Sequence, residues 1–259
     1  MPWYTPVPAA ADLRGALVCA WTADVAGTHV LVPDGCIDVL WLAGVGIRVC
    51  GPETSAWTFT RPPGTAAVGV RFRPGAAPAL LGARARDIRD TRIDLADVCA
   101  ARENRLLRDR LDHATSAEDR IMLLQNAVRG WCARATIVDE LAPRLGAALE
   151  ERSWTVAALA DAAAMTERHL QRRCQDAFGY SPATLRSILR LQRFMRLARA
   201  APQRGLAELA VAAGYADQAH LSRECRRIGS RTPTELLASQ APDWHGGAPL
   251  FVTSERAAA

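Results

Sequence analysis

The N-terminal third of the chain shows the hydrophobic pattern of a β-rich domain. Short apolar runs alternate with clusters of glycine and proline, which is typical of strands joined by tight turns. Pro33-Asp34-Gly35 is the strongest turn signal, and an apolar segment lies on each side of it. The pattern predicts strands over residues 30–32, 37–41, 47–50, 56–60 and 66–72, and a short helix over 76–81.

From Leu95 to about Arg134 the apolar positions recur at helical spacing, in two segments. The first segment runs through Leu106, Leu107 and Leu111. The second begins near Ser116, whose hydroxyl is suited to cap it, and its apolar face carries Ile121, Leu124, Val128 and Trp131. Such a pair of helices either forms a dimer surface or covers the β-rich part, and the pattern favours neither.

The next part of the chain predicts a succession of capped helices. The first covers residues 138–151, and Ser153 is expected to cap the following helix over 155–163. Thr166 then caps a helix through Phe178, which Gly179 ends because glycine readily adopts the left-handed conformation found at helix ends. These signals are local, so they fix where each helix begins and ends.

A long helix follows, and shorter ones complete the pattern. Ser181-Pro182 starts the long helix, and Pro202 ends it at about Ala201. Further helices are expected over residues 206–213 and 217–228, with a last short one that starts at Thr232-Pro233. Residues from Gln240 onward are predicted to form a loose tail.

Two of these helix pairs repeat the same pattern. Leu159-Ala160-x-x-Ala163-x-Met165 recurs fifty positions later as Leu209-Ala210-x-x-Ala213-Gly214-Tyr215. His169-Leu170-Gln171-Arg172 recurs fifty-one positions later as His220-Leu221-Ser222-Arg223, so the turn of the second copy has one extra residue. The repeat indicates two helix-turn-helix units in tandem.

The second helix of such a unit enters the major groove of DNA, where its N-terminal side chains meet base edges. Leu170 and Leu221 are expected to face inward. The outward positions are then predicted to contact bases: Arg168, Gln171 and Arg172 in the first unit, and Gln218, Ala219, Ser222 and Arg223 in the second. Arginine suits guanine and glutamine suits adenine. A solvated polar face is the alternative for one helix alone, and two copies in matched register argue against it.

The smaller side chains of the second unit favour contacts with phosphate and with DNA shape over base contacts. His169 and His220 match each other and are interpreted as capping or packing residues rather than catalytic groups or metal ligands. Cys174 and Cys225 also match, and their place on the inward face indicates core residues.

The long helix between the units supplies a geometric argument. Residues 182–200 span about 28 Å at 1.5 Å per residue, so the two second helices can lie roughly one DNA turn of ~34 Å apart. Five arginines lie on this helix with no acidic residue between them: Arg186, Arg190, Arg193, Arg196 and Arg199. We expect phosphate contacts from Thr166, Arg186, Arg190, Arg193 and His220.

These patterns predict an α+β fold: a β-rich, sensor-like N-terminal domain with flanking helices, and an all-α C-terminal domain of two helix-turn-helix units joined by a long helix. The expected bounds are 1–93 for the β-rich effector domain, 94–136 for a helical linker or dimerisation segment, 137–239 for the DNA-binding domain and 240–259 for a flexible tail.

Composition adds a modest bias toward a polyanionic partner. The 259 residues include 32 basic ones, all arginine, and the formal net charge is +5 with a pI near 9.0. The absence of lysine favours a GC-rich coding genome over a selected function. The start of the chain lacks the features of a signal peptide, and no stretch reaches the ~18 apolar residues of a membrane span. Seven cysteines without a C-x-x-C pair indicate reduced thiols in the cytoplasm.

The N-terminal domain offers candidate residues for sensing a signal. Three of its tryptophans either fill the core or line an apolar pocket. Asp34, Cys36 and Asp38 alternate and are expected to share one face of a strand. The candidate pocket residues are Trp21, Cys36, Asp38, Trp41, Trp57 and Arg71. A thiol or metal sensor that also used His29, Glu53, Cys19 or Cys50 is an alternative, but nothing has metal-ligand spacing, so we expect no metal and no cofactor.

Residues 138–238 resemble the DNA-binding domain of the AraC/XylS family of bacterial transcription regulators. The matching motifs are Thr166-x-x-His169-Leu170-Gln171-Arg172, Phe178-Gly179-Tyr180-Ser181-Pro182, Ala213-Gly214-Tyr215-x-Asp217-Gln218-x-His220-Leu221-Ser222-Arg223, and Thr232-Pro233. The resemblance implies a seven-helix, bipartite domain with base contacts at Arg168, Gln171, Arg172, Ala219 and Arg223. The chain departs from the family pattern at Arg168, at Cys174 and Cys225, and at Ile228-Gly229-Ser230-Arg231.

The N-terminal half resembles a poorly characterised module that often precedes this domain. Pro33-Asp34-Gly35-Cys36-x-Asp38 and Arg71-Phe72-Arg73-Pro74-Gly75 carry the likeness. By analogy with the architecture of the family, this module senses a signal or mediates dimerisation.

The sequence therefore predicts a ligand-responsive, sequence-specific transcription regulator in the bacterial cytoplasm, associated with the nucleoid. Its expected partners are double-stranded promoter DNA, RNA polymerase, a small-molecule effector and a second copy of the chain, with no membrane. The alternatives are a cysteine-based redox or metal-responsive regulator, a regulator fused to a DNA-repair alkyl acceptor, and a purely structural DNA-binding protein. The cysteines at 19, 36, 50 and 99 are too dispersed for a zinc-activated thiolate, and no phosphate loop or nucleophile elbow is present, so no enzyme is expected.

Overall fold

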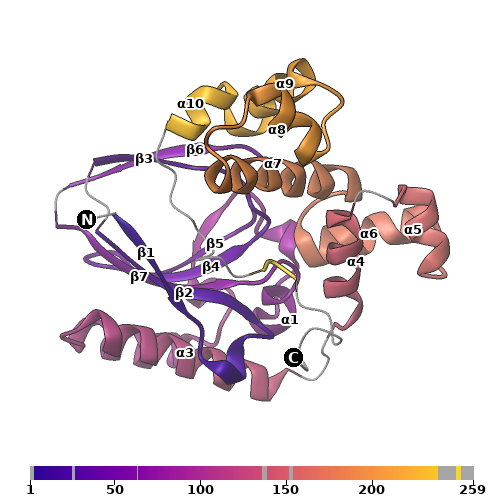
Figure 1. Ribbon diagram of the computed structural model, residues 1–259. Coiled ribbons are helices and arrows are strands. Elements are labelled where there is room, and N and C mark those ends of the chain that lie inside the picture. Colours follow the sequence, from indigo (N-terminus) through magenta and orange to yellow (C-terminus); the bar gives the residue numbers. More distant parts are fainter. Residues whose placement is uncertain are drawn as a thin grey trace.

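The computed structural model describes residues 3–24, 27–62, 64–135, 139–151, 154–238 and 249–251. The expected α+β class is confirmed, because the strands gather in the N-terminal part and the C-terminal part is helical (Figure 1). Among the described residues, no helix combines the length and the apolar character required to cross a membrane.

The larger sheet is antiparallel and contains six strands in the order β1-β2-β7-β4-β5-β8. Their bounds are Tyr4–Pro8 for β1, Leu17–Asp24 for β2, Ala66–Phe72 for β7, Ile37–Leu42 for β4, Gly46–Cys50 for β5 and Arg92–Asp94 for β8. A second sheet pairs β3, Gly27–Leu31, with β6, Trp57–Arg61. Sequence reasoning missed β1, β2 and β8.

The turn at Pro33-Asp34-Gly35 does not close a hairpin. Gly35 has a φ of 85°, as the turn signal suggested, but β3 pairs with β6 while β4 pairs with β5 and β7. The turn therefore carries the chain from the small sheet to the large one. The strands that flank it do not pair because each has a partner from a distant part of the sequence.

Two helices, α2, Ala101–His113, and α3, Ala117–Arg134, cover one face of the large sheet. Figure 1 shows α3 running beneath the strands. Ser116 caps α3 as predicted, since its Oγ accepts a hydrogen bond from the Asp119 amide at 3.0 Å. The Trp131 ring lies 6.3 Å from that of Phe72 on β7. The apolar faces of both helices are thus buried against the sheet, and each large side chain buried there contributes roughly 1.5–3 kcal/mol. Shorter segments lie around these helices. Helix α1, Ala77–Leu81, and the 3₁₀ turn η1, Ala11–Leu13, contact α3, and the 3₁₀ turn η3, Leu95–Asp97, contacts α2. The remaining 3₁₀ turn, η2, Ala85–Asp87, contacts a helix of the C-terminal part.

The C-terminal helices begin and end close to the predicted positions. Their bounds are Leu141–Glu150 for α4, Val156–Ala162 for α5, Glu167–Phe178 for α6, Pro182–Ala200 for α7, Leu206–Ala213 for α8, Gln218–Gly229 for α9 and Pro233–Ala238 for α10. One cap differs from the prediction. Thr155 caps α5 by accepting from the Ala158 amide at 3.1 Å, whereas Ser153 lies outside the described residues.

The predicted loose tail is wrong for residues 249–251, the described part of this segment after α10. Leu250 and Phe251 are buried, and Phe251 packs against Phe178 with its ring closely over Gly146. The Pro249 carbonyl accepts a hydrogen bond from Arg73. Leu250 and Phe251 are two apolar residues in a segment of mostly polar and small residues. The overall composition of the segment predicted a tail, although two large apolar side chains are enough to pack against the core. The rest of the predicted tail, 240–248 and 252–259, lies outside the described residues.

Candidate nucleic-acid interface and small-molecule pocket

The first helix-turn-helix unit consists of α5 and α6. Ala164 adopts a left-handed conformation with φ of 52°, and the Met165 amide donates to the Ala160 carbonyl at 2.9 Å. Thr166 then caps α6, with its Oγ1 accepting from the His169 amide at 3.2 Å. Leu170 is fully buried, which holds α6 against the rest of the domain and turns its polar face outward.

The second unit, α8 and α9, repeats this geometry. Gly214 has a φ of 103°, the Tyr215 amide donates to the Ala210 carbonyl at 2.9 Å, and Asp217 Oδ1 accepts from the His220 amide at 2.6 Å. The extra residue identified in the sequence is Ala216, which is exposed between the turn and the cap. An insertion at an exposed site leaves the turn and the cap in matching positions.

The structure places most of the predicted base-contact residues on exposed helix faces. Arg168, Gln171 and Arg172 are exposed on α6, as are Gln218, Ala219 and Arg223 on α9. Ser222 differs, because it is half-buried and its hydroxyl donates to the Gln218 carbonyl of its own helix at 2.9 Å. The first unit therefore presents three long hydrogen-bonding side chains, and the second presents fewer.

Four of the five predicted phosphate contacts divide into two groups, and the fifth, Arg186, is half-buried on α7. Thr166 is exposed beside α6, and His220 is half-buried with its ring edge-on to Tyr215 at 5.3 Å. Two arginines of α7 instead make contacts within the protein. Arg190 lies 4.6 Å from the centroid of the Tyr215 ring and its Nη2 is 3.6 Å from Glu224, while Arg193 donates to the Glu150 carbonyl.

The basic face predicted for α7 is therefore not a solvated stripe. Helices α4, α6, α8 and α9 pack around α7, so Arg186, Arg190 and Arg193 are half-buried and only Arg196 and Arg199 are exposed. The helical spacing showed correctly which arginines share a face. It could not show that neighbouring helices cover that face.

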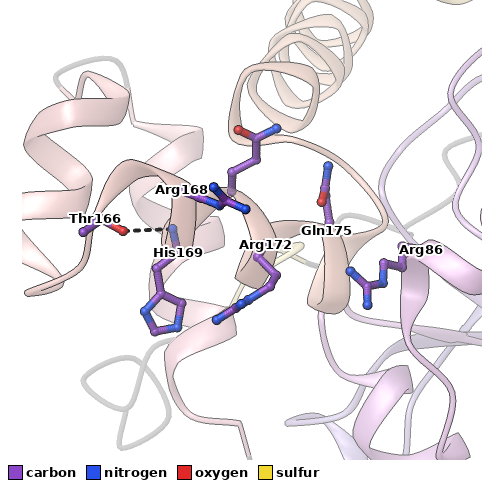
Figure 2. A pocket seen from close by; sticks show the side chains of 7 residues that line it. Arg86, Thr166, Arg168, His169, Arg172 and Gln175 are labelled. Carbon is purple, nitrogen blue, oxygen red and sulfur yellow. Dashed lines mark hydrogen bonds between the residues drawn. The ribbon is translucent and has the colours of Figure 1, made fainter.

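A groove runs beside the exposed face of α6 (Figure 2). Its volume is about 590 Å³, and seven residues line it. Six of them are Thr166, which caps α6, and five residues of α6, among them Arg168, Gln171 and Arg172. The seventh, Arg86, comes from η2 in the N-terminal domain. The Nε of Arg86 is 3.0 Å from Asp176 Oδ1 near the end of α6. Sequence reasoning gave no signal for Arg86, because ninety residues separate it from its partner.

The C-terminal helical half packs on the N-terminal domain. Arg89 donates to the Gly179 carbonyl at 3.1 Å, and the Tyr180 hydroxyl donates to the Glu53 carbonyl at 2.6 Å. At a third point, Gln192 Nε2 on α7 donates to the Pro33 carbonyl at 2.7 Å, and both groups are buried. One continuous cluster of buried apolar side chains also includes residues of both halves.

A cavity of about 450 Å³ lies between the two sheets of the N-terminal domain. Of the predicted pocket residues, Trp21, Asp38, Trp57 and Arg71 line it. Cys36 lines a smaller adjoining cavity of about 50 Å³ with several of the same residues. The lining also includes residues that the sequence did not single out: Trp3, Tyr4, Phe59, Arg48, Arg61 and Arg92.

Trp41 was wrongly assigned to this pocket. It points to the opposite face of the sheet, where its Nε1 donates to Asp112 at 2.6 Å and the Arg120 guanidinium lies 4.3 Å from its ring. Side chains alternate between the two faces of a strand, so Asp38 and Trp41, three positions apart on β4, face opposite sides. The alternation was visible in the sequence and contradicted the grouping.

Arg71 joins the two predicted aspartates at the edge of the cavity. Its Nη1 is 3.0 Å from Asp34 and its Nη2 is 2.8 Å from Asp38, which also accepts from Trp21 Nε1 at 2.9 Å. Burial lowers the pKa of Arg71, but the carboxylates of Asp38 and Asp34 outweigh it and leave the pKa raised. The guanidinium is therefore permanently charged and fixed between the two carboxylates.

The cysteines near the cavity are poorly suited to redox sensing. Burial, reinforced by the Asp34 carboxylate, raises the pKa of the Cys36 thiol well above its usual range. Burial also raises the pKa of Cys19 to about 11 and that of Cys50 to about 12. A reactive cysteine requires thiolate at neutral pH, which these surroundings suppress. Within the described ranges, no group of three or more His, Cys, Asp and Glu side chains is placed to hold a metal ion.

Two families match the chain. Residues 159–239 match a helix-turn-helix domain, and residues 5–94 match a domain of unknown function, DUF6597. No curated protein matches. Solved structures of ToxT from Vibrio cholerae are similar at low identity. The crystal structure from strain O395 has 11% identity and a TM-score of 0.46, over 93% of this chain and 99% of ToxT. The apo form of a ToxT variant from strain SCE256 has 13% identity and a TM-score of 0.46, over 85% and 97%.

Proposed function

We propose that this chain, a DNA-binding transcription regulator with an AraC-type helix-turn-helix domain behind a DUF6597 domain, reads two successive major grooves under the control of a small molecule. The observation that carries the proposal is the repeat of one geometry at α5–α6 and α8–α9. Each unit has a fully buried leucine, a side-chain cap and an exposed arginine at the same position of the second helix: Leu170, Thr166 and Arg172, then Leu221, Asp217 and Arg223.

The first unit is the proposed main reader of base sequence. Arg168 and Arg172 suit guanine, and Gln171 suits adenine. In the second unit Arg223 and Gln218 remain candidate base contacts, and Ala219 suits the methyl group of thymine. Thr166, Arg186 and His220 remain proposed phosphate contacts. Arg190 and Arg193 are reassigned, because they bind Glu224, Tyr215 and the Glu150 carbonyl within the protein.

The cavity between the sheets is the proposed effector site. Five aromatic rings and four arginines line it, together with the single carboxylate of Asp38. Such a lining suits an apolar molecule that carries an anionic group. Aromatic and cationic groups lie side by side in this lining, since the Arg92 guanidinium lies 3.4 Å from the centroid of the Trp57 ring.

Buried polar contacts connect this cavity with the DNA-binding domain. Asp38, in the cavity wall, binds Arg71, and Arg71 binds Asp34 in the turn before β4. The carbonyl of Pro33 in the same turn accepts from Gln192 on α7, the helix that joins the two units. An effector that changes the position of Asp38 or Arg71 would bias the position of α7, which is the differential contact that ligand control requires.

The two characteristic motifs of the N-terminal domain are at this junction. The motif that begins at Pro33 supplies Asp34, and a Cβ at its Gly35 would lie 3.5 Å from Leu185 of α7. The motif that runs from Arg71 to Gly75 supplies Arg71, and a Cβ at Gly75 would lie 2.9 Å from the Phe178 ring of α6. Both motifs therefore combine an ionic contact with a close backbone approach to a helix of the DNA-binding domain.

The decisive experiment measures fluorescence anisotropy of the full chain on DNA from upstream of its own gene and on a scrambled duplex, at fixed salt. A preference for the upstream duplex supports the regulator. The same measurement is made with the fragment 138–240. If the full chain and the fragment each bind the upstream and the scrambled duplex with equal affinity, sequence-specific control at this promoter region is contradicted.

A second variant tests the effector site. Leu40 lines the cavity from β4, and Leu40→Trp should fill part of it. A metabolite that changes DNA binding by the wild type should no longer do so with this variant, while DNA binding without the metabolite stays the same. A retained response would contradict the assignment of the cavity.

RNA polymerase and a second copy of the chain remain proposed partners. A redox mechanism through Cys36 is disfavoured by the burial of its thiol.

A further inference from the structure

The groove beside α6 is built by both halves of the molecule. Figure 2 shows Arg86, from the N-terminal domain, facing the same space as Arg172 and His169. The residues that line the groove are three arginines, two glutamines, a histidine and a threonine, with no carboxylate among them. Such a lining is complementary to a polyanion and offers hydrogen-bond donors along its whole length.

Two carboxylates lie near the Nε of Arg86. Asp176 Oδ1 is 3.0 Å from it and Asp87 Oδ1 is 3.8 Å from it, and the Arg86 side chain is 34% exposed. The guanidinium group has five N–H donors in a planar fork, so carboxylates on the Nε side leave donors for a further anion. Asp176 thus holds the arginine at the edge of the groove without using all of its hydrogen-bonding capacity.

We propose that Arg86 of the N-terminal domain binds a phosphate of the DNA strand that passes α6, so that the DNA interface extends beyond the helix-turn-helix domain. The proposal rests on the proposed function, because it requires α6 to lie in the major groove. Protein side chains beside a recognition helix commonly bind the phosphates that flank the groove and so fix the register of the helix. Arg86 is placed for this role next to Arg172.

The proposal has a consequence for control. Arg86 belongs to the domain that contains the cavity, and Arg172 belongs to the domain that reads bases. Both can bind one DNA site only when the two domains keep the relative position seen here. A shift at the junction would therefore remove a phosphate contact directly, without any change inside either helix-turn-helix unit.

Salt dependence on a random-sequence duplex tests the phosphate contact, since this measurement needs no knowledge of the operator. Each phosphate contact that is lost lowers the slope of log K against log salt by about 0.9. Arg86→Ala in the full chain should lower the slope by about that amount, and Arg86→Lys should retain it. Arg84→Ala is the matched control, because Arg84 is two residues away, 58% exposed and paired with Asp87 rather than placed in the groove.

Asp176→Asn separates phosphate binding from attachment of the domains. This variant breaks the same ion pair but removes a negative charge near the DNA, so it should bind DNA at least as tightly as the wild type. A loss of slope with Asp176→Asn equal to that with Arg86→Ala would assign the effect to domain attachment and overturn the proposal. An Arg86→Ala slope equal to that of Arg84→Ala would overturn it as well.

Arg172→Ala on upstream DNA shows which hypothesis has failed. If this variant loses specific binding while Arg86→Ala changes nothing, only the role of Arg86 is wrong. If Arg172→Ala also binds like the wild type, the proposed function itself is wrong.

Discussion

The two helix-turn-helix units share a fold but differ in what supports them. The first docks on the N-terminal domain, through Arg86, Arg89 and the residues around Gly179. The second is attached to α7 by Arg190, which contacts both Tyr215 and Glu224, and it meets the N-terminal domain where the Ala56 amide donates to the Ile228 carbonyl of α9 at 2.6 Å. The first presents three long hydrogen-bonding side chains, and the second presents two, Gln218 and Arg223. From this comparison we propose that base reading and control by the N-terminal domain are concentrated in the first unit.

The largest difference between the two units is expected in stability, when the residue that ends the second helix of each unit is substituted. Gly179 ends α6 with a φ of 79°, and a Cβ there would lie 2.7 Å from Pro52 of the N-terminal domain. Gly179→Ala should lower the free energy of unfolding by about 2–5 kcal/mol, from the left-handed backbone and the overpacking together. Urea denaturation of the full chain measures this loss.

Gly82→Ala is the matched control for that experiment. Gly82 also has a left-handed conformation, with a φ of 68°, but a Cβ there would meet no atom within 4 Å. It should show the backbone cost of about 1–2 kcal/mol alone. Equal losses for Gly82→Ala and Gly179→Ala would mean that the junction at Pro52 yields easily.

The next largest difference concerns the matched arginines. Arg172→Ala should weaken binding to the specific duplex by about 1–3 kcal/mol and leave binding to scrambled DNA nearly unchanged. Arg223→Ala should cost less on the specific duplex and reduce the preference for that duplex less, because fewer donors surround Arg223. Anisotropy titrations at fixed salt compare the two variants. If Arg223→Ala reduced specificity as much as Arg172→Ala, the proposed division between the units would be wrong.

A smaller effect of opposite sign is expected in the second unit. Ser230 is at the position that Gly179 occupies in the first, and it is exposed with a φ of 55°. Ser230→Gly relieves the left-handed strain of about 1–2 kcal/mol but adds freedom to the unfolded chain worth about 0.4–1 kcal/mol. The variant should therefore be more stable by up to about 1.6 kcal/mol in the same urea experiment. A destabilised variant would show that the serine side chain has a contact of its own.

The smallest difference is expected between the matched cysteines. Cys174 and Cys225 are both fully buried, and burial raises the pKa of each to about 12. At pH 8 both should resist alkylation while the exposed Cys132 reacts, as peptide mass spectrometry can follow. Faster labelling of Cys225 than of Cys174 would indicate that the second unit opens more readily, in line with its fewer polar contacts with the N-terminal domain.

The helices were predictable because their signals are local. Thr166, Ser181 and Gly179 act on backbone groups within a few residues, so the sequence was enough to place the ends of α6 and the start of α7. The sheet was harder because its pairs are distant in sequence. Trp21 pairs with Gly69, and its ring occupies the space that a Cβ at Gly69 would need. Nothing in either segment alone shows that match.

The residues of the candidate site divide in the same way into those that local pattern placed and those that it could not place. The helical repeat correctly placed Arg172 and Arg223 on exposed faces, since the period of a helix relates each to its buried leucine. The repeat could not place Arg190, whose environment depends on how α8 and α9 pack on α7, nor Arg86, which reaches the groove from another domain. These positions are set by tertiary packing and not by local pattern.

The shared core has a consequence for the exchange of domains between regulators. Phe178 of α6 packs against Gly75 on one side and Phe251 on the other, and Leu185 of α7 lies beside Gly35. Grafting this DNA-binding domain onto an unrelated sensor would leave those apolar side chains without partners. A working chimera would have to carry over the turns at residues 33–36 and 73–76 along with the helices, so the unit of inheritance here includes the junction as well as the two domains.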